Sequence, residues 1–156
     1  MDLDPLLDLF QALSDEGVAY VLVGGVALNV HGIVRATQDV DLFVSADEDN
    51  IRRLRTALRR VWDDPDIDQI SAEDLAGEYP VVRYGPPDFE LVIDVISRLG
   101  DAIAFEDLEW SHIEVEGVSI AVATPAMLHR MKRDTVRTID RADAEALRER
   151  FGLEGS

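Results

Sequence analysis

The sequence predicts one α/β (α+β) domain, a mixed β-sheet with helices packed on it. The chain has 156 residues, which is the length of one domain. Hydrophobic residues make up 47% of the chain, enough to bury a core. Candidate strands and helices alternate along the chain with no repeat or low-complexity linker between them, so we expect residues 1–156 to form a single domain.

Caps, apolar runs and glycines define the elements of the first half. Asp4 and Pro5 are typical of a helix start, and Gly17 is typical of a helix end. An apolar run over 18–23 predicts a buried strand that Gly24-Gly25 interrupts. Three further elements are expected: a short helix over 26–30, a strand over 38–44, and a helix over 46–62 that opens on a capping box formed by Ser45 and Glu48.

The second half begins with a polar stretch over 63–80, which we interpret as a loop with one short helix after Ser71. Strands are expected over 81–84 and 90–97, a helical segment over 105–110, and a hairpin whose strands, 112–115 and 119–123, flank Glu116-Gly117. Thr124-Pro125 opens a helix that reaches about Lys132, and the last helix covers 140–151. One hairpin among alternating elements indicates a mixed sheet.

Charge and composition exclude several classes of function. Fifteen basic residues against thirty-two acidic ones give a net charge of −17, which repels nucleic acid at long range. The chain has no cysteine, and this excludes a disulfide framework, a thiolate nucleophile and a thiolate metal site. No apolar run approaches the ~20 residues that cross a bilayer, and the acidic start after Met1 is unlike a signal peptide. We therefore expect a cytoplasmic protein without membrane contact.

Three carboxylates are the strongest candidates for a metal site. Asp39 and Asp41 point to one face of their strand because alternate residues share a face. Asp94 stands alone in an otherwise apolar strand that is predicted to be buried, where a carboxylate is costly unless it is paired or binds metal. Oxygen ligands of this kind suit Mg²⁺ or Mn²⁺. The alternatives are two exposed acids on an edge strand, and a buried aspartate satisfied by an arginine or by backbone amides.

Two other segments are candidates for binding phosphate. The Gly24-Gly25 turn lets a phosphate approach backbone amides, although a plain tight turn explains the same pair. Towards the C-terminus, Lys132 lies on a helix, and three charged residues follow at a spacing of three: Arg137, Asp140 and Asp143. A lysine near the metal would neutralise triphosphate charge, whereas the alternative is a solvated charged face with internal ion pairs.

Together these motifs resemble a known family. Gly24-Gly25, then the segment RATQDVDL from Arg35 to Leu42, then Asp94 in its apolar strand, resemble the minimal form of the DNA polymerase β-like nucleotidyltransferase superfamily. The segment from Leu128 to Asp143 is similar to the later motifs of the AbiEii-type branch, which includes toxins of toxin–antitoxin pairs. The resemblance covers residues 18–151.

The resemblance implies a mixed sheet with helices and gives the residues roles. It implies that Asp39, Asp41 and Asp94 bind the metal and are catalytic, and that Gly24 and Gly25 hold the triphosphate. Lys132 is implied to contact nucleotide phosphates and Asp140 to support the nucleotide site. Many relatives have Gly-Ser at the turn, so this chain, with Gly25, lacks that serine hydroxyl.

The implied reaction is attack by an acceptor hydroxyl on the α-phosphorus of an NTP, with pyrophosphate leaving. The acceptor is the 3′ end of a tRNA, a protein side chain or a small molecule, and a partner protein of a toxin–antitoxin pair is implied. On this hypothesis Asp94→Asn abolishes transfer and stabilises the metal-free fold, because one repulsion disappears.

Two other functions stay open from the sequence. One is a nucleotidyltransferase-like binding module, or an antitoxin-type partner, without catalysis. The other is a phosphohydrolase that uses the Asp39-Val40-Asp41 motif. The helix over 46–62 carries five arginines: Arg52, Arg53, Arg55, Arg59 and Arg60. They either form a local phosphate-binding patch or lie on a solvated helix, compensated by the acids at its N-terminus, Asp47, Glu48 and Asp49.

Overall fold

The structure, a computed structural model, describes residues 4–77, 80–99, 103–132 and 138–153. Its helices are α1 (Asp4–Asp15), α2 (Gly24–Val30), α3 (Glu48–Val61), α4 (Ala72–Leu75), α5 (Pro125–Lys132) and α6 (Thr138–Phe151), with 3₁₀ turns η1 (Pro65–Gln69) and η2 (Phe105–Asp107). Its strands are β1 (Tyr20–Val23), β2 (Asp39–Val44), β3 (Val81–Tyr84), β4 (Val92–Ile96), β5 (Arg98–Leu99), β6 (Ile103–Ala104), β7 (Trp110–Val115) and β8 (Val118–Ala123). The α+β class expected from the sequence is confirmed.

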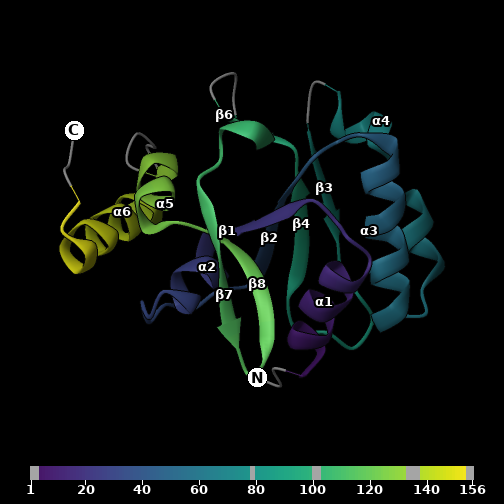
Figure 1. Ribbon diagram of the computed structural model, residues 1–156, viewed down its shortest axis with the longest axis horizontal. Helices are drawn as coiled ribbons and strands as arrows, with labels where there is room; N and C mark the ends of the chain where they lie inside the picture. The colour runs from purple at the N-terminus through teal and green to yellow at the C-terminus, as the bar shows by residue number, and fades with distance from the viewer. Residues whose placement is uncertain (1–3, 78–79, 100–102, 133–137, 154–156) are drawn as a thin grey trace.

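Six strands form one mixed sheet in the order β3-β4-β2-β1-β8-β7 (Figure 1). The pairs β2–β4 and β1–β8 are parallel, and the remaining neighbours in this sheet are antiparallel. β5 and β6 form a separate antiparallel pair. In Figure 1, α1 and α3 lie beside each other at one side of the sheet, and α5 packs on α6 at the other end.

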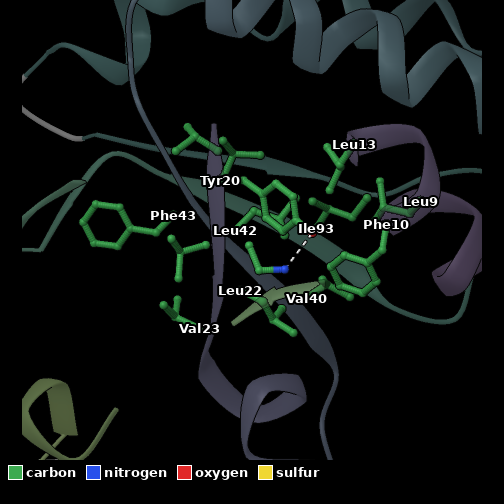
Figure 2. Packing of buried hydrophobic residues seen from close by; sticks show 14 of the residues in the cluster. Leu9, Phe10, Leu13, Tyr20, Leu22, Val23, Val40, Leu42, Phe43 and Ile93 are labelled. Atoms are coloured by element: carbon green, nitrogen blue, oxygen red, sulfur yellow. Dashed lines mark hydrogen bonds between the residues drawn. The ribbon is translucent and has the colours of Figure 1, made fainter. Parts of the chain in front are cut away.

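The core lies between the sheet and α1 with α3. Figure 2 shows Leu9, Phe10 and Leu13 of α1 on the same side of the sheet as Leu42 and Ile93. All five are fully buried or nearly so. Because neighbours along a strand point to opposite faces, the residues that alternate with Leu42 and Ile93 point away from α1. That other face of β2 carries Asp39 and Asp41 beside the fully buried Phe43, and on β4 it carries Asp94 between the half-buried Val92 and Ile96.

Two buried residues with polar side chains, Tyr20 and Asn50, are hydrogen-bonded within this core. The hydroxyl of Tyr20 accepts a hydrogen bond from the Ala121 N–H at 3.1 Å (Figure 2), and burial raises the pKa of Tyr20. The side chain of Asn50 donates to the carbonyl oxygens of Ala19 and Ser45 and accepts from the Ala19 N–H. These bonds fix the entry of β1 against the start of α3.

Several local predictions need correction. The N-cap of α3 is Asp47, whose side chain accepts the Asn50 N–H at 2.9 Å, and Ser45 instead donates to Asp47. α2 begins at Gly24 rather than at residue 26. The segment expected to be helical over 105–110 is one 3₁₀ turn, after which β7 begins at Trp110. The β5–β6 pair was not predicted, because two-residue strands carry no periodicity.

In the part of the chain that the structure describes, no helix combines the length and the apolar character needed to cross a bilayer.

The hairpin expected around Glu116-Gly117 is present as β7–β8, and both turn residues have positive φ, 50° and 80°. This is the backbone of the tight hairpin turn that the sequence predicts.

Candidate active site

Three carboxylates converge on the face of the sheet opposite α1. Asp39 and Asp41 lie on β2, and Asp94 lies on β4. The parallel pairing of these strands sets Asp41 directly beside Asp94. One oxygen from each of the three side chains lies within 4.8 Å of the others. We call Asp39, Asp41 and Asp94 the carboxylate cluster.

The burial of Asp94 differs from the sequence prediction. Ile93 and Val95 are fully buried, but the Asp94 side chain between them is 14% exposed. β4 therefore alternates between fully buried and half-buried residues, because only one of its faces is completely covered by the core. A half-buried carboxylate is reachable by a cation from outside, which a fully buried one is not.

Gly24 is packed directly against the cluster. Its φ is +74°, which L side chains rarely adopt, and a Cβ built on it would lie 1.9 Å from Asp41 Oδ2. A side chain at this position would therefore strain the backbone and push the Asp41 carboxylate aside. The first glycine of the pair is required for contact between the turn and the cluster.

The space beside Gly25 is filled by two side chains that the sequence analysis gave no role. A Cβ on Gly25 would lie 2.2 Å from Arg35 Nη1 and 2.8 Å from Thr37 Oγ1. Thr37 donates a hydrogen bond from Oγ1 to the Asp39 carbonyl oxygen at 3.0 Å, which ties this space to the first residue of β2. A serine at position 25 would therefore require Arg35 and Thr37 to move.

Arg35 also joins the glycine turn to the C-terminal helix. Its Nε lies 2.9 Å from Asp143 Oδ1 on α6, and the two side chains are 18% and 6% exposed. Both residues stand in motifs that the sequence analysis quoted, but their pairing across 108 positions is visible only in the fold. Of the segment from Leu128 to Asp143, the structure brings Asp143 to the turn.

Arg83 is in direct contact with two of the carboxylates. Its Nε donates to Asp94 Oδ1 at 2.9 Å and its Nη2 donates to Asp94 Oδ2 at 3.2 Å. Nη2 also lies 3.4 Å from Asp39 Oδ1. These bonds and charges, Asp94 first, raise the pKa of Arg83. The sequence left open whether Asp94 is paired with an arginine or joins the other two carboxylates. The structure shows both, since Asp94 pairs with Arg83 and also lies beside Asp39 and Asp41.

The contact between Arg83 and Asp94 also affects how far Asp94→Asn is expected to stabilise the metal-free fold. That expectation assumes an uncompensated repulsion among the carboxylates, whereas Arg83 compensates part of it. It stays a prediction, and the gain is expected in full only where Arg83 is removed as well.

The remaining implied phosphate contacts are not described at the level of side chains. Lys132 is the last residue of α5, and Asp140 lies in the first turn of α6, but their side chains are outside the described part. Arg137 lies outside the described residues altogether. Their roles stay predictions.

The arginines of α3 are compensated, but only Arg52 and Arg53 by an acid at the start of the helix, as the sequence predicts. The other three have partners outside the helix. Asp49 pairs with Arg52 and Arg53. Arg59 pairs with Asp68, and Arg60 lies 3.1 Å from carboxylate oxygens of both Asp15 and Glu16. Arg55 donates to the Ile70 carbonyl oxygen at 2.7 Å. No open basic patch is left on the described surface of this helix.

The cluster fits a divalent cation. Three carboxylates that approach within 4.8 Å repel one another and together present a negative, oxygen-only donor set. Hard ions such as Mg²⁺ and Mn²⁺ prefer such ligands. Among the described residues this is the one group of three candidate ligands that converges in this way. Beside a glycine turn, such a centre is suited to chemistry on a phosphate ester.

Comparison with known proteins supports this interpretation of the site. Residues 7–145 match the family described as "Nucleotidyl transferase AbiEii toxin, Type IV TA system", which is most of the chain and includes the cluster and the glycine turn. No curated protein sequence matches.

Solved structures with the same fold include three nucleotidyltransferase-like proteins. An antigenic nucleotidyltransferase-like protein from Paracoccidioides brasiliensis has a TM-score of 0.59 at 17% identity, over 93% of this chain and 74% of that one. A putative nucleotidyltransferase from Thermotoga maritima has a TM-score of 0.52 at 16% identity, over 96% and 92%. ANT(2")-Ia in complex with adenylyl-2"-tobramycin has a TM-score of 0.55 at 14% identity, over 94% and 87%.

Proposed function

The chain belongs to the AbiEii family of nucleotidyl transferase toxins of type IV toxin–antitoxin systems, and on that premise we propose that it transfers a nucleoside monophosphate from an NTP to an acceptor hydroxyl with Mg²⁺ or Mn²⁺. The observation that carries the proposal is the convergence of Asp39, Asp41 and Asp94 within 4.8 Å beside Gly24. A family member that had lost catalysis would not need all three carboxylates in register.

Each group has a task in this reaction. Asp39, Asp41 and Asp94 would hold the divalent ion, which would neutralise charge at the phosphates and lower the pKa of the attacking hydroxyl. Asp94 accepts the proton of the acceptor hydroxyl. The new bond joins the acceptor oxygen to the α-phosphorus, the bond from that phosphorus to the bridging oxygen breaks, and pyrophosphate leaves with the electron pair.

The glycine turn and the helical lysine bind the triphosphate. Gly24 and Gly25 let phosphate oxygens approach backbone amides that a side chain would screen. Lys132, at the end of α5, neutralises charge on the phosphates, and Asp140 supports the nucleotide site. Arg35 stands behind Gly25 and holds the turn to α6 through Asp143.

The acceptor is a tRNA 3′ end, a protein side chain or a small hydroxylated molecule. The enzyme acts in the cytoplasm, where NTPs are abundant, and is held in check by an antitoxin protein. The compensated arginines of α3 favour a small or locally bound acceptor over one held along a broad basic surface.

A transfer assay tests the proposal. The protein is incubated with Mg²⁺ and each α-labelled NTP, with total tRNA present or absent, beside an Asp39→Ala/Asp41→Ala double variant. Label on tRNA or on protein that the double variant fails to produce supports the proposal and identifies the acceptor class.

Other outcomes point elsewhere. Nucleotide binding that the double variant loses, without transfer, directs the search to small-molecule acceptors. Release of phosphate without transfer indicates the phosphohydrolase, and neither binding nor transfer leaves the non-catalytic binding module.

A further inference from the structure

Arg83 lies where a cation is needed. It stands on β3, directly opposite Asp94 on β4 in the antiparallel register, so its side chain points to the same face as the carboxylate cluster. Three of its contacts reach that cluster: both oxygens of Asp94 and one oxygen of Asp39. Two of the three candidate metal ligands are therefore engaged by one guanidinium.

This arrangement differs from an ordinary surface ion pair. Exposed ion pairs contribute little, and those around α3 engage no residue of the carboxylate cluster. Here one planar guanidinium faces two aspartates that, with Asp41, would repel one another without a positive charge between them. β3 is an edge strand, and charges on edge strands also discourage strand addition. That general role would not require contacts to two metal ligands.

The guanidinium can also leave. The Arg83 side chain is 64% exposed, against 14% for Asp94 and 36% for Asp39. A long side chain with this exposure moves into solvent without disturbing the core. The carboxylates stay fixed by the sheet while their cationic partner is exchangeable.

We propose that Arg83 is a resident cation of the carboxylate cluster, which holds Asp39 and Asp94 in place when no metal ion is bound and competes with the divalent ion for their oxygens. The metal displaces Arg83 from Asp94, and the guanidinium turns outward towards solvent. This inference rests on the metal site of the proposed function and adds a residue that sets the metal concentration at which that site fills.

The test compares metal affinity in variants of the whole chain. Mn²⁺ binding is followed by the loss of the free-ion signal in electron paramagnetic resonance, and Mg²⁺ binding by the rise in melting temperature. Arg83→Gln removes the charge and keeps a side chain of moderate length. Arg59→Gln is the matched control, since it removes the same charge from an exposed pair with Asp68.

If Arg83 competes with the metal, Arg83→Gln binds Mn²⁺ about tenfold more tightly than the parent chain, the equivalent of one lost charge-assisted hydrogen bond. Its metal-free melting temperature falls, because Asp39 and Asp94 then lose the guanidinium that they share. Arg83→Lys, which keeps the charge but not the forked geometry, is intermediate. Arg59→Gln stays within about twofold of the parent chain.

Mn²⁺ affinity in Arg83→Gln equal to that of Arg59→Gln, or weaker than that of the parent chain, overturns the inference. Asp94→Asn separates this failure from a failure of the proposed function. If Asp94→Asn loses Mn²⁺ binding while Arg83→Gln gains none, only the role of Arg83 is wrong. If Asp94→Asn binds Mn²⁺ like the parent chain, the metal is not held by the cluster, and both proposals fail.

Discussion

Two regions of this molecule are built from aspartate and arginine, and they differ in every other respect. Around α3, the ion pairs join side chains that are mostly exposed, such as Arg59 and Asp68, which are 47% and 65% exposed. At the active site, Arg35 and Asp143 are 18% and 6% exposed, and the aspartates of the carboxylate cluster are half-buried on a sheet. The same residue types therefore meet different surroundings.

The difference lies in what holds the charged groups in place. Exposed side chains on a helix exchange partners in water, so their pairs contribute little and leave no field in a fixed direction. Side chains on neighbouring strands are held at a spacing set by the backbone, and partial burial strengthens their interactions. An acidic chain thus gains a specific site only where the sheet prevents the acids from avoiding one another.

Asp41→Asn gives the largest contrast between the regions. We expect nucleotidyl transfer to fall by at least about 10²-fold, because one of three fixed ligands is lost. Asp49→Asn on α3 removes the same charge from exposed pairs with Arg52 and Arg53 and is expected to leave transfer unchanged. Single-turnover rates with an α-labelled NTP measure both. Equal loss in the two variants would show that net charge, not the cluster, governs transfer.

Gly24→Ala sharpens the comparison within the site. Its φ of +74° costs about 1 kcal/mol for a non-glycine residue, and the new Cβ displaces the Asp41 carboxylate, whose Oδ2 would lie 1.9 Å away. Gly117→Ala has the same backbone cost at φ +80° with nothing within 4 Å. We expect a lower melting temperature for Gly24→Ala than for Gly117→Ala, because only the Cβ at position 24 meets Asp41. We also expect at least tenfold weaker Mn²⁺ binding in Gly24→Ala alone. Loss of Mn²⁺ binding in both would point to the fold rather than to the contact with Asp41.

Asp143→Asn tests the buried pair against the exposed one. Leaving Arg35 charged and without its carboxylate partner is expected to lower the free energy of unfolding by about 3 kcal/mol. Asp68→Asn breaks the exposed pair with Arg59 and is expected to cost less than about 0.5 kcal/mol. Urea denaturation at neutral pH compares them. A cost for Asp143→Asn no larger than that for Asp68→Asn would mean that α6 is not held to the glycine turn by this pair.

The smallest effect is expected at the start of α3. Asp47 accepts the Asn50 N–H, and this bond, followed by the one from Ser45, lowers the pKa of Asp47 below its ordinary value of 3.8. Its contribution is therefore complete above pH 3.8 and is lost as the pH falls through the lowered pKa. Asp47→Ala is expected to cost about 1 kcal/mol at neutral pH, less in acid, and to leave transfer unchanged. Melting curves at pH 7 and pH 3 measure this difference, and an equal cost at both would contradict it.

Much of the site is encoded in local patterns. Alternation along a strand places Asp39 and Asp41 on one face, and an acid among apolar neighbours singles out Asp94; neither depends on the rest of the chain. Glycine pairs and hairpin turns are local for the same reason, since they follow from backbone conformations that few residues adopt. The mixed sheet and the late hairpin were predictable on these grounds.

Only the tertiary structure decided which of these patterns meet. The parallel pairing of β2 with β4 sets Asp41 beside Asp94, 53 positions away in the sequence. The edge strand β3 places Arg83 where its side chain contacts Asp94 on β4 and Asp39 on β2. Arg35 finds Asp143 through the packing of α6, and the exposed face of β4 makes Asp94 half-buried rather than fully buried. The periodicity of a strand predicts which face of the sheet a residue occupies. Which strands become neighbours depends on long-range packing, because the whole core must be buried against the sheet.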